Sequence, residues 1–145
     1  MSYDSIFKPD LFQNKLVVVT GGGSGIGRCT AHELAALGAT VVITGRQADK
    51  LKNVATEIES DGGAVDFLAF DIRDAVAVAD KVDEILRRHG KIDGLVNNAG
   101  GQFPARLEDI SQNGWNAVVA TNLTGGFLVS REVYKQWMKG NGGSI

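Results

Sequence analysis

The sequence predicts an α/β fold built on a doubly wound parallel sheet, and two observations carry that prediction. Short apolar runs typical of buried strands alternate with longer segments whose apolar residues recur at helical spacing. The first apolar run leads directly into a glycine-rich loop and then into an amphipathic segment. No linker divides the 145 residues, so we expect one domain, with residues 1–14 as an N-terminal arm.

Each expected element has a local reason. Residues 16–19 are continuously apolar and mostly β-branched, which is typical of a central strand buried on both faces. Glycines stop the helices that follow. The expected order is a strand at 16–19, a helix from 26 to 38, a strand at 40–44, a helix carrying Leu51 to Ile58 that stops at 61–63, a strand at 65–70, a helix carrying Val76 to Leu86 that closes at 89–90, a strand at 92–96, a long helix from about 113 to 138, a turn at 140–143 and the start of a fifth strand at 144–145.

Composition narrows the classes of function. The net charge of -2, with Lys and Arg spread along the chain, gives no basic stripe for nucleic acid. No segment is typical of a signal peptide or a membrane span, and the single cysteine, Cys29, favours a reducing compartment and a small packed side chain. We expect a cytoplasmic protein, with a peroxisomal location left open. His32 and His89 have no acidic or cysteine neighbours at ligand spacing, so no metal site is expected.

The loop Thr20-Gly21-Gly22-Gly23-Ser24-Gly25-Ile26-Gly27 is the strongest candidate binding element. Amides at a helix N-terminus, together with the helix dipole, hold a diphosphate, provided that side chains do not block its approach. We expect Gly21 to permit a tight exit from the strand, Gly25 to let the backbone near the phosphate, and Gly27 to let helix and strand touch. The alternative is a merely flexible loop. The residues expected to contact a dinucleotide here are Gly21, Gly23, Ser24, Gly25, Ile26 and Gly27.

The end of the second strand suggests which dinucleotide binds. An acid is usual there when the ribose is unphosphorylated, but this chain has Gly45 followed by Arg46. A guanidinium pairs with a 2′-phosphate through two hydrogen bonds. The sequence therefore favours NADP(H) as the cofactor, with NAD(H) as the alternative. The competing interpretation of Arg46 is an ordinary solvated charge in a loop.

With these motifs, the chain resembles the short-chain dehydrogenase/reductase family from Lys15 onward, which implies a Rossmann fold. Asp71-Ile72 matches the family pair that contacts adenine, and Asn97-Asn98-Ala99-Gly100 matches its Asn-Asn-Ala-Gly motif, which lines the adenosine ribose. Asn122 matches the helix asparagine that the family counts as catalytic, through a water held by its backbone carbonyl. The resemblance thus assigns Asp71, Ile72, Asn98, Ala99 and Gly100 to the cofactor and Asn122 to catalysis.

Within the family, several local stretches are most similar to peroxisomal trans-2-enoyl-CoA reductases and to bacterial citronellol dehydrogenases. The resemblance implies hydride transfer to or from an enoyl-CoA or a medium-chain alcohol or aldehyde. It also implies a homo-oligomer when the protein is intact.

The family's proton-transfer pair, Tyr-x-x-x-Lys, is not found in the chain. Tyr3 is followed four residues later by Phe7, and Tyr134 by Met138. The resemblance places the catalytic Ser, Tyr and Lys after Ile145, so we expect a fold truncated before its fifth strand and inactive alone. The alternatives are a nucleotide-binding module without catalysis and a fragment that does not fold.

Overall fold

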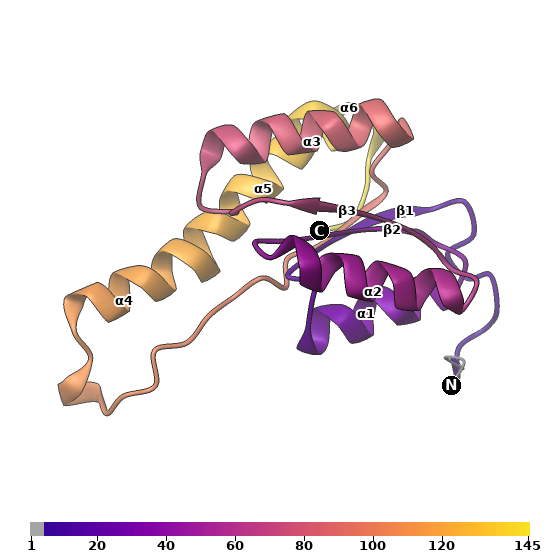
Figure 1. Ribbon diagram of the computed structural model, residues 1–145. Helices are drawn as coiled ribbons and strands as arrows, with labels where there is room; N and C mark the ends of the chain where they lie inside the picture. Colours follow the sequence, from indigo (N-terminus) through magenta and orange to yellow (C-terminus); the bar gives the residue numbers. More distant parts are fainter. Residues whose placement is uncertain (1–4) are drawn as a thin grey trace.

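The computed structural model describes residues 5–145, so Tyr3 and the first part of the expected arm lie outside the described residues. Four parallel strands form one sheet in the order β3-β2-β1-β4. Figure 1 shows α1 and α2 on one face of this sheet and α3 with the C-terminal helix on the other. The predicted doubly wound α/β fold is confirmed.

The elements alternate as the sequence predicts. Boundaries differ by one or two residues, because strand ends are set by pairing with neighbours as well as by local pattern. The observed elements are β1 (Leu16–Thr20), α1 (Gly25–Ala36), β2 (Thr40–Gly45), α2 (Ala48–Ser60), β3 (Ala64–Ala69), α3 (Ala75–His89) and β4 (Gly94–Val96).

The predicted long helix is a continuous helical segment that contains two π-helical stretches. It comprises α4 (Gln112–Val118), the π-helical turns η2 (Val119–Gly125) and η3 (Tyr134–Met138), α5 (Gly126–Val133) between them, and α6 (Lys139–Asn141). A short 3-10 turn, η1 (Leu107–Asp109), precedes it. Figure 1 shows α4 and the loop before it projecting beyond the sheet.

The predicted turn at 140–143 is wrong in its first half. Gly140 and Asn141 are helical, since the Asn141 side chain donates to the Trp137 carbonyl at 2.9 Å and closes the last turn. The chain turns only at Gly142 (φ 73°) and Gly143 (φ 152°). Both φ values are positive and favour glycine, so the turn depends on Gly142 and Gly143 and not on Gly140.

Ser144 begins a fourth parallel pairing, which adds the start of a fifth strand to the sheet. Ser144 pairs with Gly94 in a parallel bridge, and its carbonyl accepts from the Leu95 amide at 2.9 Å. The Ser144 amide donates to the Asp93 carbonyl at 3.1 Å. The expected start of a strand at 144–145 is therefore confirmed, on the free side of β4.

The apolar core has two parts, one on each face of the sheet. Val18, Val42 and Leu95 face α3 and α5, while Val19, Val41 and Ile43 face α1 and α2. All five residues of β1 are buried, as its apolar run predicts. Burial on both faces fixes β1 at the centre of the sheet, with its carboxyl end beside those of β2 and β4.

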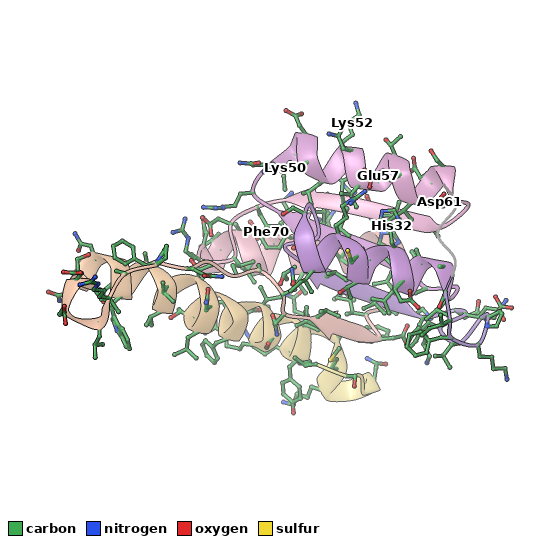
Figure 2. All side chains as sticks on the ribbon, turned by 90° about the horizontal axis from the view of Figure 1, so that it is seen from below. His32, Lys50, Lys52, Glu57, Asp61 and Phe70 are labelled. Carbon is green, nitrogen blue, oxygen red and sulfur yellow. The ribbon has the colours of Figure 1, made fainter. Side chains whose placement is uncertain are left out.

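Two side-chain expectations are corrected by the packing. Cys29 is exposed on α1 and is not a packed side chain, because its position faces away from the sheet. His32 does have an acidic neighbour, brought from α2: its Nε2 lies 3.1 Å from Glu57 Oε2, and Figure 2 shows the two side chains close together. His89 Nε2 likewise lies 2.9 Å from Asp66 Oδ2. Spacing along the chain gave no sign of these contacts between elements.

Residues 5–145 contain no group of three or more His, Cys, Asp or Glu side chains that could hold a metal ion. Within the same range no helix combines the length and apolarity that a membrane span requires.

We predict that α3 is held by its buried face. Ile85→Ala removes a side chain that is 1% exposed and should lower the free energy of unfolding by about 2–5 kcal/mol, because a cavity replaces packed methylenes. Val76→Ala on the same helix is the control: Val76 is 72% exposed, so its replacement should change stability by less than about 0.5 kcal/mol. Urea unfolding followed by circular dichroism measures both, and equal losses would contradict this account of the core.

Candidate functional site

A cleft of about 300 Å³ opens at the carboxyl ends of the parallel strands. In a doubly wound sheet this is where ligands bind, at the point where the strand order reverses on either side of β1. Residues from all four strand ends meet there. Its lining includes nine of the residues singled out from the sequence: Gly21, Gly23, Ser24, Arg46, Asp71, Ile72, Asn98, Ala99 and Gly100.

The floor of the cleft depends on close contact between the glycine loop and the chain after β4. Gly21 has a φ of 69°, and a Cβ there would lie 2.9 Å from the Ala99 Cα. A Cβ on Gly27 would lie 2.4 Å from both the Gly21 carbonyl oxygen and Asn98 Nδ2. No side chain fits in either position, which confirms the predicted tight exit at Gly21 and the helix-to-strand contact at Gly27.

Thr20 and Asn98 tie the two strand ends together. The buried Thr20 hydroxyl accepts from the Asn98 and Ala99 amides, each at 3.0 Å. Asn98 Nδ2 donates back to the Thr20 carbonyl at 2.9 Å. These bonds fix the path of residues 97–100 beside the loop, so the sequence motif acts first as a structural clamp.

The N-terminus of α1 is open to a ligand. Ser24 makes no side-chain capping bond, whereas Asp74 caps α3 by accepting from the Val76 and Ala77 amides. Gly25 has a φ of 53°, and a Cβ there would meet nothing within 4 Å. Gly25, Ile26 and Gly27 do not line the cleft itself; they form the first turn of α1, and Ile26 is 79% exposed. First-turn amides without a side-chain cap are suited to an anion.

Three cations line the cleft, and the sequence identified only Arg46. Lys50, in the first turn of α2, and Arg73, two residues after Asp71, join it through the fold. Among residues 5–145, neither Arg46 nor Lys50 makes an ion pair or a side-chain hydrogen bond. Arg73 is different, because it is paired with Asp71.

The Asp71 carboxylate is held by Arg73. Arg73 Nε donates to Oδ1 at 3.0 Å and Nη2 donates to Oδ2 at 2.6 Å, while the Arg73 amide donates to Oδ1 at 2.9 Å. The hydrogen bonds from Arg73, outweighing partial burial, lower the pKa of Asp71 to about 2, and the nearby charge of Arg46 acts in the same direction. Asp71 is therefore ionised and largely neutralised at the cleft.

Asn122 lies outside the cleft lining, in the π-helical turn η2. Its Oδ1 accepts from the Gly101 amide at 2.8 Å and its Nδ2 donates to the Gly101 carbonyl at 3.1 Å. Single π-helical turns are frequent at functional sites. The side chain thus anchors the loop that follows the Asn-Asn-Ala-Gly motif, and its role in catalysis stays a prediction.

Other lining residues had little signal in the sequence. Phe70, which directly follows β3, and Thr121, near the start of η2, also line the cleft. For the two cations that were not identified from the sequence, the available signals were the spacing Asp71-x-Arg73 and the position of Lys50 in the first turn of a helix. Ile72 is 6% exposed, and a Cβ on Gly125 would lie 2.6 Å from its Cδ1, so Ile72 also supports η2.

The profile of the family described as short chain dehydrogenase matches residues 15–145. That match includes the glycine loop, Asp71-Ile72, the Asn-Asn-Ala-Gly motif and Asn122. The chain belongs to the short-chain dehydrogenase family. This confirms the resemblance drawn from the motifs.

Individual relatives agree with that membership. A probable 2,4-dienoyl-CoA reductase of Bacillus subtilis is 36% identical over 126 residues, which are 87% of this chain and 50% of the relative. The structure of a citronellol catabolism dehydrogenase of Pseudomonas aeruginosa is 59% identical, with a TM-score of 0.94, covering 99% of this chain and 59% of the other. A metagenomic short-chain oxidoreductase in complex with NADP is 36% identical, with a TM-score of 0.83, covering 91% and 60%.

The chain spans about half the length of the first of these relatives, and less than two thirds of the two solved structures.

We predict that the Thr20 hydroxyl is essential to the clamp. Thr20→Val should lower the free energy of unfolding by about 1–3 kcal/mol, because the part-buried Ala99 amide loses its acceptor and the Asn98 amide keeps only the Val96 carbonyl. Thr44→Val is a matched control: Thr44 is the register partner of Thr20 in β2, and its buried hydroxyl has no partner among residues 5–145. That change should be neutral or stabilising in thermal unfolding. If the two variants lost the same stability, the clamp would not be the cause.

We also predict that Arg73 sets the titration of Asp71. Arg73→Ala should raise the pKa of Asp71 from about 2 toward 3.8, because the cation and its hydrogen bonds favour the ionised form. The pair stabilises the fold above pH 3.8, and this contribution is lost as the pH falls through about 2. Carboxyl carbon shifts in an NMR titration measure it. Arg87→Ala, which breaks only an exposed pair with Asp83 on α3, should leave Asp71 unchanged.

Proposed function

We propose that this chain binds NADP(H) and forms the nucleotide-binding part of an oxidoreductase that transfers hydride to or from a small-molecule substrate. Membership of the family supports the oxidoreductase class. The preference for the phosphorylated cofactor is carried by one observation, the unpaired Arg46 that follows the end of β2 and lines the cleft.

The residues present fit such a cofactor. A carboxylate at the end of β2 would repel a 2′-phosphate, but Gly45 and Arg46 stand there. The one acid of the lining, Asp71, is already held by Arg73. The open first turn of α1 offers amides to the diphosphate, and Asn98, Ala99 and Gly100 line the path beside it. A nicotinamide cofactor supplies the hydride chemistry when bound.

The names of relatives suggest the substrate class. The Bacillus subtilis relative is named a 2,4-dienoyl-CoA reductase, and the Pseudomonas aeruginosa structure is titled a citronellol catabolism dehydrogenase. We propose an enoyl-CoA, or a medium-chain alcohol or aldehyde, as the substrate of the whole protein. Reduction of dienoyl-CoA or citronellal with NADPH tests this class, and inactivity of the whole protein on both would reject it.

A second proposal concerns the 145 residues themselves. Neither tyrosine is followed by Lys four residues later, so this chain has no Tyr-x-x-x-Lys pair with which to move a proton. We propose that it binds the nucleotide without turning over substrate. Steady oxidation of NADPH by this chain with citronellal would contradict that proposal and leave nucleotide binding untouched.

We also propose a homo-oligomer for the whole protein. Trp115, Leu123, Phe127 and Tyr134 leave more than half of their surface exposed along one helical segment. Large apolar side chains gathered on one element are typical of a surface that is covered by a partner.

We predict a clear preference between the two cofactors. The chain should bind NADPH at least about tenfold more tightly than NADH, because a charge-assisted pair with Arg46 is available only to the 2′-phosphate. Arg46→Ala should weaken NADPH by about 10- to 100-fold and NADH little. Titration of nucleotide fluorescence measures both affinities, with Arg87→Ala as the control on an exposed site of α3. Equal affinities unchanged by Arg46→Ala would reject NADP(H) as the preferred cofactor.

A further inference from the structure

Positive charge is in excess around the cleft. Its lining carries three cations, Arg46, Lys50 and Arg73, and one acid, Asp71. Arg73 holds both oxygens of Asp71 with hydrogen bonds of 2.6 to 3.1 Å, and Asp71 makes no ion pair with Arg46 or Lys50, although the charge of Arg46 acts on it at longer range. Among residues 5–145, Arg46 and Lys50 therefore make no ion pair, and the cleft carries a net positive charge that a bound anion would balance.

The base of the Lys50 side chain lies against the glycine loop. A Cβ built on Gly23 would lie 3.3 Å from Lys50 Cβ, so the first turn of α2 packs against the glycine loop at this residue. The adjacent Leu51, which is 1% exposed, fixes the rotation of that turn. With its Cβ beside Gly23, the exposed Lys50 side chain lines the cleft.

Lys52 provides a contrast on the same helix. It follows Lys50 by two residues, is exposed, and is not part of the cleft lining. Figure 2 shows Lys50 leaving α2 near its N-terminal end, while Lys52 points away from the body into solvent. Two lysines of the same chemistry thus differ in whether they reach the cleft.

The chemistry of the two free cations is complementary. Arg46 offers a planar fork that can bind two oxygens of a phosphate, and Lys50 offers a mobile point charge that can approach a third. Two like charges at one cleft repel each other, and a bound anion relieves that repulsion. A phosphate monoester carries close to two negative charges, so two cations balance its charge better than one cation does.

We propose that Lys50 is a second specificity-determining residue, which binds the ribose 2′-phosphate of NADP(H) together with Arg46. This inference rests on the proposed function and names a residue that the glycine-loop and strand-end motifs do not include. Lys50 adds affinity only for nucleotides that carry the extra phosphate.

The test uses a variant that keeps the stem. Lys50→Met retains the packing on Gly23 and removes the charge, and should weaken NADPH and 2′,5′-ADP by about tenfold while leaving NADH and 5′-AMP unchanged. Lys50→Arg restores the charge and should recover most of the affinity. Lys52→Met, the matched control, should change none of these affinities. Equal melting temperatures of the variants confirm that the fold is intact, since both lysines are exposed.

The outcomes separate the two proposals. If Lys50→Met weakened NADPH and NADH equally, Lys50 would act on the diphosphate, and the inference would be wrong. If Lys50→Met had no effect while Arg46→Ala still weakened NADPH, the inference would be wrong and the proposed cofactor would stand. If the unaltered chain showed no preference for 2′-phosphorylated nucleotides, both would be rejected.

Discussion

The structure depends on one contact, the approach of the glycine loop to the chain that leaves β4. Asn98 Nδ2 and the Gly21 carbonyl both occupy space that a Cβ on Gly27 would need, at 2.4 Å from its position. The same amide donates to the Thr20 carbonyl, and the Thr20 hydroxyl accepts from the Asn98 and Ala99 amides. Close packing is possible here only because the loop has no side chains in the way.

The clamp separates two kinds of recognition. At the first turn of α1, uncapped amides can bind a diphosphate whatever nucleotide carries it. At the ends of β2 and β3, charged side chains are added to a backbone that is already in place. Arg73 pairs with Asp71 there, and among the described residues the remaining cations form no ion pair with a protein carboxylate. Under the proposed function, affinity for the shared part of a dinucleotide and discrimination by its extra phosphate therefore depend on different residues.

Much of this could be predicted from the sequence because local patterns report local requirements. The run at 16–19 indicated a strand buried on both faces, and Gly21 and Gly27 indicated places where a side chain would clash. Contacts between distant elements were not predictable in the same way. Lys50 reaches the cleft because α2 packs beside Gly23, and His32 meets Glu57 because α1 and α2 lie side by side. Gly140 continues the helix because glycine permits a turn there without requiring one.

The separation of the two kinds of recognition also explains why the sequence gave little indication of Lys50. Thr20 is buried, and Thr20 and Asn98 each have several partners, so a change at either residue would disturb both strands that it joins. Arg46 and Lys50 are exposed and have no protein partner among the described residues, so the fold places few demands on them. A change of cofactor preference can then arise at positions 46 and 50 at little cost in stability. In such a cleft, the cofactor preference is best inferred from charged side chains that make no ion pair within the protein, here Arg46 and Lys50.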